Sequence, residues 1–94
     1  MKTLADVRRR LVVGTEVEIV NYIRPVASGH RKVKKAQASG ICWDAGPSTP
    51  NGAWLDWPKA AYVKITGPDE VMFLCGEKLC PEEPTKPFLT IRFK

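Results

Sequence analysis

The chain has 94 residues, of which 44% are hydrophobic and 27% are charged, and its formal net charge is +5 at pH 7. This length allows one hydrophobic core, and this composition is typical of a globular domain rather than a disordered chain. No apolar run reaches the roughly 20 residues needed to cross a bilayer, so we expect no membrane partner. We expect a single domain over residues 1–94, with a helix at about 4–12 and a barrel at about 15–94.

The first segment of the chain predicts a short helix. Thr3–Asp6 has the form of a capping box, with a hydroxyl at the N-cap and an acid three residues later. Leu4, Val7 and Leu11 then follow at the spacing of one helical face. Arg8–Arg10 would lie in the last turn, where positive charge complements the helix dipole.

From residue 15 onward the hydrophobic residues alternate with polar ones, and glycines and prolines interrupt the pattern at short intervals. This predicts five to seven short antiparallel strands, which fits a mainly-β fold, a small SH3-like barrel preceded by one N-terminal helix. An OB-fold fits less well because Pro58–Ala61 is too short for its usual helix. We expect Gly76–Pro87 to be a flexible excursion. The expected strands lie at residues 15–23, 30–39, 41–43, 53–57, 62–66, 71–75 and 88–93.

Three short motifs carry a resemblance. They are the Leu-Ala-Asp segment at Leu4–Asp6, the Val-Gly-Thr step at Val13–Thr15 and Trp-Leu-Asp-Trp-Pro-Lys-Ala at Trp54–Ala60. With these motifs the chain resembles a family of small uncharacterised proteins of bacteriophages and bacterial mobile elements. The resemblance implies such an origin and a compact β domain, and it implies no catalytic residue.

The positive charge is concentrated at one end of the chain. Residues 1–40 carry nine Lys and Arg against three Asp and Glu, whereas residues 41–94 carry six against seven. Clustered cations attract polyanions, so we expect contacts to nucleic-acid phosphates. The expected nucleic-acid-binding residues are Arg8, Arg9, Arg10, Arg31, Lys32, Lys34 and Lys35, with Trp57 as an aromatic contact.

Each of these signals has an ordinary structural explanation as well. Arginines suit a helix C-terminus, and lysines on an edge strand discourage aggregation between sheets. Trp54 and Trp57 are three residues apart, so in one strand they would face opposite sides. We therefore expect one of them to be buried and the other partly exposed. The ordinary explanation for these tryptophans is that Trp–Pro packing closes the end of a small barrel.

The remaining chemistry-bearing residues form no convincing site. Cys75, Cys80, Cys42 and His30 would complete a zinc set, but only the first two are close in sequence. We expect no metal, no cofactor and no catalytic residue, because no nucleophile, phosphate-loop or metalloprotease motif is present. The odd number of cysteines and the absence of an apolar leader favour free thiols in the cytoplasm.

The sequence thus predicts a non-enzymatic binding module. DNA or RNA is the first expected partner, bound mainly through phosphates and with little sequence specificity. The alternative is a phage or mobile-element accessory protein that binds, or binds and inhibits, a host protein. In that case the Trp-Leu-Asp-Trp-Pro motif at Trp54–Pro58 and the proline-rich loops would form its surface.

Overall fold

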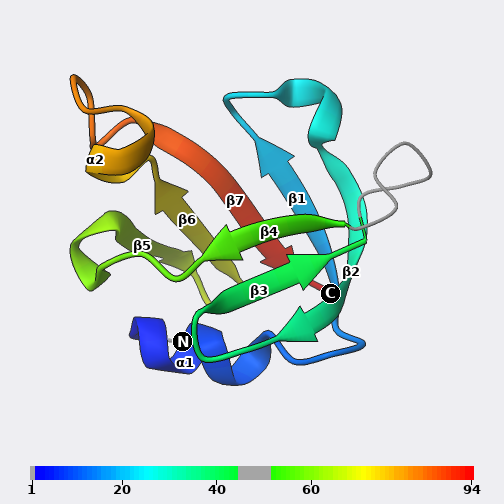
Figure 1. Ribbon diagram of the computed structural model, residues 1–94. Helices are drawn as coiled ribbons and strands as arrows, with labels where there is room; N and C mark the ends of the chain where they lie inside the picture. Colours follow the sequence, from blue (N-terminus) through cyan, green and yellow to red (C-terminus); the bar gives the residue numbers. More distant parts are fainter. Residues whose placement is uncertain (1, 45–51) are drawn as a thin grey trace.

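The computed structural model describes residues 2–44 and 52–94. Within these residues, antiparallel strands form one sheet in the order β4-β3-β2-β1-β7-β6-β5, curled into a half-barrel (Figure 1). The strands are β1 (Glu16–Asn21), β2 (Gly29–Ala36), β3 (Gly40–Trp43), β4 (Ala53–Asp56), β5 (Val63–Gly67), β6 (Glu70–Leu74) and β7 (Pro87–Phe93). The helical elements are α1 (Leu4–Arg10), α2 (Gly76–Leu79) and the 3₁₀ turns Pro25–Ala27 and Ala60–Tyr62. The predicted mainly-β fold, a small barrel of short antiparallel strands after one N-terminal helix, is confirmed.

The capping box of α1 forms as its sequence predicts. The Asp6 amide donates to Thr3 Oγ1 over 3.3 Å, and the Thr3 amide donates to Asp6 Oδ2 over 3.2 Å. The helix ends at Arg10, earlier than expected, because Leu11 leaves helical geometry at φ −86° and ψ 70°. The Gly14 amide then donates to Val33 O in β2, so the chain is already paired with β2 when it enters β1. No helix of the described part of the chain is long and apolar enough to cross a membrane.

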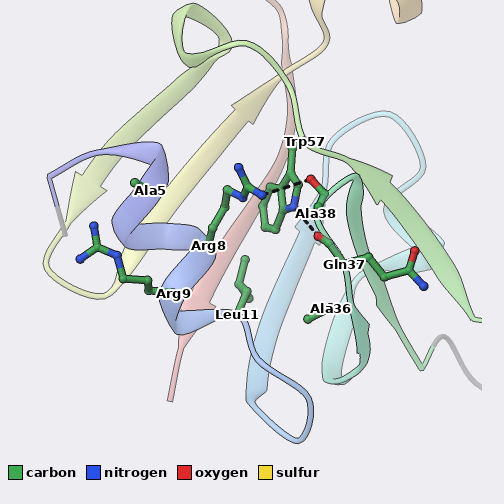
Figure 2. Close-up of a pocket in the computed structure, with 8 residues that line it drawn as sticks. All are labelled: Ala5, Arg8, Arg9, Leu11, Ala36, Gln37, Ala38 and Trp57. Atoms are coloured by element: carbon green, nitrogen blue, oxygen red, sulfur yellow. Dashed lines mark hydrogen bonds between the residues drawn. The ribbon is translucent and has the colours of Figure 1, made fainter.

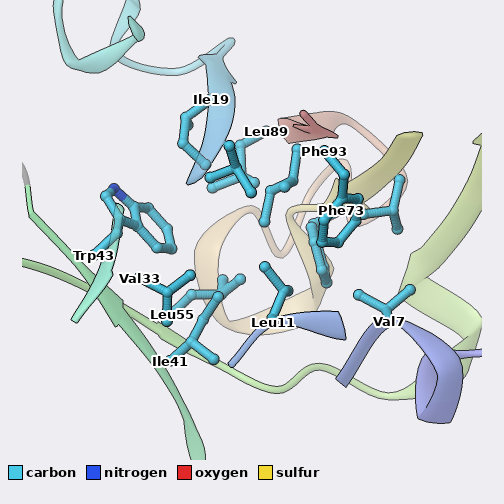
Figure 3. Packing of buried hydrophobic residues seen from close by; sticks show 13 residues of the cluster. Val7, Leu11, Ile19, Val33, Ile41, Trp43, Leu55, Phe73, Leu89 and Phe93 are labelled. Atoms are coloured by element: carbon cyan, nitrogen blue, oxygen red, sulfur yellow. The ribbon is translucent and has the colours of Figure 1, made fainter. Parts of the chain in front are cut away.

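The core lies inside the curled sheet and is closed at one end by α1 (Figure 3). Val7 and Leu11 enter it from the helix and its C-cap, and both are fully buried. The strands contribute alternate residues, so their inward faces carry the large apolar side chains. These are Val17, Ile19, Val33, Ile41, Trp43, Leu55, Val71, Phe73, Leu89, Ile91 and Phe93.

Strand β1 is shorter than predicted because its last side chain starts a turn. Asn21 Oδ1 accepts hydrogen bonds from the amides of Ile23 (3.0 Å) and Arg24 (2.8 Å). An asparagine that binds the backbone two residues ahead replaces the strand ladder with a turn. Ile23, expected inside the strand, is therefore 47% exposed.

Gly76–Pro87, which we expected to be a flexible excursion, contains a short helix that was not predicted from the sequence. The segment forms α2 and two turns, and backbone hydrogen bonds tie it to itself and to the end of β6. The Cys75 amide donates to Lys86 O and the Gly76 amide to Pro84 O, each over 2.8 Å. Prolines restrict the backbone on their own, so a proline-rich segment can be well ordered when its remaining amides find partners.

Candidate functional site

A hollow of about 410 Å³ lies between α1 and the turn that joins β2 to β3 (Figure 2). We call it the α1–hairpin pocket. It combines small apolar side chains with two arginines and an indole ring. Its lining residues are Ala5, Arg8, Arg9, Leu11, Ala36, Gln37, Ala38 and Trp57.

Arg8 and Trp57 meet on one wall of this pocket. Arg8 Nη2 donates to Ala38 O over 3.1 Å, and its Cζ lies 5.5 Å from the centroid of the Trp57 ring. The ring is held from the hairpin, because Trp57 Nε1 donates to Gln37 O over 3.1 Å. Guanidinium and indole therefore face each other at the outer range of a cation–π contact.

Arg9 provides the second cation of the pocket. Its side chain is 75% exposed and lies 3.4 Å from the Asp6 carboxylate, a pair one helical turn apart. Figure 2 shows its guanidinium pointing away from the Trp57 ring. An exposed pair of this kind contributes little to stability, so Arg9 can exchange its partner for another anion at small cost.

Two lysines of β2 lie just before the pocket residue Ala36 in the sequence, but neither of them lines the pocket. Lys34 and Lys35 directly precede Ala36, which lines the pocket, and both are exposed. The register places Ala36 opposite the buried Ile41, and Lys35 opposite its neighbour Cys42. Neighbouring strand residues face opposite sides, so Lys35 lies on the outer face of the hairpin.

Two of the predicted nucleic-acid contacts are engaged elsewhere. Arg10 Nη1 donates to Asp69 Oδ1 over 2.9 Å, and its guanidinium lies 4.1 Å from the centroid of the Phe93 ring. Arg31 folds back on its own strand and donates to the carbonyl oxygens of Ala27, Ser28 and His30 at 2.8–3.3 Å. Both arginines thus hold turns of the fold in place.

Lys32 belongs to a second, mixed-charge hollow of about 370 Å³. It lies directly opposite Glu16 in the β1–β2 register. In the same hollow Lys94 Nζ lies 3.2 Å from His30 Nε2. The lining residues are Glu16, Val17, His30, Arg31, Lys32, Asp44 and Lys94. The acidic residues make this hollow a weaker anion site than the α1–hairpin pocket.

The outer face of β1, β7 and β6 is also balanced in charge. Arg92 lies between two carboxylates, donating to Glu70 over 2.7 Å and to Glu18 over 3.1 Å. Its hydrogen bond lowers the pKa of Glu70, and the two carboxylates in turn raise the pKa of Arg92. Arg92 is therefore engaged with carboxylates in the fold and is a weaker candidate for phosphate contact than Arg9.

The expectation that one of the two tryptophans is buried was wrong: Trp57 lies just after the end of β4, so strand parity does not apply to it, and it is only partly buried. Trp54 points outward from β4 and is 44% exposed, with its indole N–H donating to Asp56. Trp57 is partly buried and packs against the core.

The pocket residues that the sequence did not identify are mostly alanines. The helical spacing of Ala5, Arg8 and Arg9, which share one face, was the available signal.

Cys42, Cys75 and Cys80 form no disulfide, and no three metal-ligating side chains come together in the described residues. Cys42 is buried beside β4, whereas Cys75 and Cys80 flank α2. Burial, reinforced by a hydrogen bond with Cys80, raises the pKa of the Cys75 thiol to about 11. A thiol of this kind stays protonated at neutral pH and is a poor nucleophile.

No protein-family model matches the chain, and no curated protein or solved structure matches it significantly. The resemblance to small phage and mobile-element proteins therefore stays a prediction.

Proposed function

We propose that the protein is a non-enzymatic module that binds nucleic acid through the phosphates, with Arg8 and Arg9 at the α1–hairpin pocket and with Lys34 and Lys35 on strand β2, just before the hairpin turn. The observation that supports this most strongly is the convergence of α1 and the β2–β3 hairpin, at the Arg8–Ala38 hydrogen bond. That contact joins the arginines of α1 to the hairpin whose first strand carries Lys34 and Lys35. Lysines and arginines from two segments can neutralise several phosphates of one nucleic-acid strand.

The number of phosphates contacted sets the expected salt dependence. Four contacts would lower the affinity about 150-fold for duplex and about 50-fold for single strands between 50 and 200 mM salt. Replacing Arg9 and Lys35 by glutamine removes two contacts, so the same increase in salt should then lower the affinity only about 10-fold. Glutamine keeps the length and hydrogen-bonding capacity of these exposed side chains.

The test is fluorescence anisotropy with labelled random-sequence DNA and RNA across that salt range. The matched control is Lys64→Gln combined with Lys78→Gln, which removes two cations from β5 and α2, outside the α1–hairpin pocket. The control should bind like the wild type. Absence of binding at low salt, or equal losses in both double variants, would contradict the proposal.

The exposed Trp54 on strand β4 favours a second candidate function, the recognition of a host protein. Strand β4 lies at one end of the sheet order, and a partner strand could add to it. Such binding would depend little on salt and strongly on an aromatic anchor, because buried aromatic side chains dominate protein interfaces. Trp54→Ala should then abolish capture of the partner, whereas the Arg9 and Lys35 double variant should retain it.

A further inference from the structure

The orientation of Trp57 is fixed by its neighbours. Its backbone amide donates to Ser39 O and its indole Nε1 donates to Gln37 O, both over 3.1 Å. The ring also packs against the core, yet it lines the α1–hairpin pocket with part of its surface. An aromatic ring held in place beside a hollow is a ready stacking platform, because little freedom is lost when a second flat group binds to it.

The cover over this platform is loosely held. Arg8 Cζ is 5.5 Å from the Trp57 ring centroid, whereas Arg10 Cζ is 4.1 Å from that of Phe93. Within residues 2–44 and 52–94, the Arg8 guanidinium donates one hydrogen bond, to Ala38 O, whereas Arg10 has both a carbonyl and a carboxylate partner. Arg8 can therefore move aside, or lie on the far face of a flat ligand, at a small cost in binding free energy.

The pocket combines an apolar floor with a cationic rim. Ala5, Leu11 and Ala36 supply the floor, and Arg8 and Arg9 supply the rim. A nucleobase has flat apolar faces and is attached to an anionic backbone, so it matches both parts. In a duplex the bases are already stacked on their neighbours, and extracting one costs a few kcal/mol.

We propose that the α1–hairpin pocket takes one unpaired base of a single-stranded nucleic acid, stacked on Trp57, while the adjoining phosphates contact Arg8 and Arg9. This inference rests on the proposed nucleic-acid binding and narrows it to single strands. Base–aromatic stacking tolerates any base, so the pocket gives strand selectivity without sequence specificity.

The test compares oligothymidine with a duplex of equal phosphate number, by anisotropy at low salt. Trp57→Leu should weaken single-strand binding about 5- to 150-fold and leave duplex binding unchanged. Trp57→Phe keeps an aromatic face and should retain most single-strand affinity. Trp54→Leu is the matched control, since Trp54 is exposed outside the pocket, and it should bind like the wild type. Thermal melting establishes that each variant is folded.

A second measurement leaves Trp57 in place. In a Trp54→Phe variant, Trp57 and the buried Trp43 are the remaining indoles, so fluorescence quenching by oligothymidine but not by duplex would report stacking on Trp57. Equal affinity for single strands and duplex, or an equal loss of both in Trp57→Leu, would overturn this inference and leave the proposed function standing. Absence of binding to either nucleic acid would overturn both.

Discussion

Substituting Gly40 tests the packing of the hairpin most directly. A Cβ at this position would lie 2.2 Å from the Leu55 carbonyl oxygen and 2.9 Å from Cζ2 of the Trp54 ring. Ordinary contact begins at 3.4 Å, so β3 and β4 would have to separate by about 1.2 Å. Overpacking of this kind costs about 1–3 kcal/mol, and a backbone obstacle places Gly40→Ala near the upper limit.

Two other glycines separate this steric cost from other effects of the same substitution. At Gly67 the nearest atom to a Cβ would be 3.7 Å away and φ is ordinary, so Gly67→Ala should be neutral or stabilising by up to about 1 kcal/mol. At Gly14 nothing lies within 4 Å, but φ is +93°. Gly14→Ala should therefore cost about 1–2 kcal/mol through backbone strain alone.

The assay is thermal and urea unfolding followed by circular dichroism. For a domain of this size 1 kcal/mol corresponds to about 4–8 °C, so a loss of 3 kcal/mol lowers the Tm of Gly40→Ala by about 12–24 °C. We expect the order Gly67→Ala, Gly14→Ala, Gly40→Ala from most to least stable. A Gly40→Ala protein that melts with the Gly67→Ala protein would refute the close packing of β3 on β4.

Two predictions concern ionisable groups. The hydrogen bond from the Lys2 amide, assisted by Thr3 and Arg9, lowers the pKa of Asp6, so its stabilising effect is present above about pH 4 and lost as the pH falls below it; an NMR titration of Asp6 that gave a raised pKa would contradict this. The raised pKa of Cys75 implies that its burial stabilises the fold below about pH 9, an effect lost as the pH rises toward 11. With a thiol reagent at pH 8, Cys80 should react first and Cys75 only upon unfolding, and a fast phase that survives Cys80→Ser would refute this.

The elements of the fold were predictable because burial of one face leaves a periodic signal in the sequence. Val17 and Ile19 lie on either side of Glu18 in β1, Leu89 and Ile91 lie on either side of Thr90 in β7, and all four apolar residues are buried. The capping box at the start of α1 was equally predictable from the sequence, since its two partners are three residues apart. Local patterns of this kind need no knowledge of distant contacts.

The candidate site was only partly predictable, because a charge count does not say which charges are engaged. Arg10 finds Asp69 59 residues further along the chain, and Arg31 binds backbone carbonyls that any sequence would supply. The meeting of Arg8 with Trp57 likewise depends on the tertiary fold. The alanines of the pocket matter through their small size, which carries no chemical signature in the sequence.

The two arginines at the end of α1 have a mechanical consequence for the sheet. Its outermost strands, β4 and β5, do not pair in the described structure, and α1 contacts turns that belong to both halves of the sheet. Arg8 fastens α1 to the β2–β3 hairpin at Ala38, and Arg10 fastens it to the β5–β6 turn at Pro68. The two links are unequal, because Arg10 has a carbonyl and a carboxylate partner whereas Arg8 has an exposed carbonyl partner. A ligand that displaces Arg8 from Ala38 would therefore loosen the hairpin end of α1 first, while the buried Val7 and Leu11 keep the helix on the core.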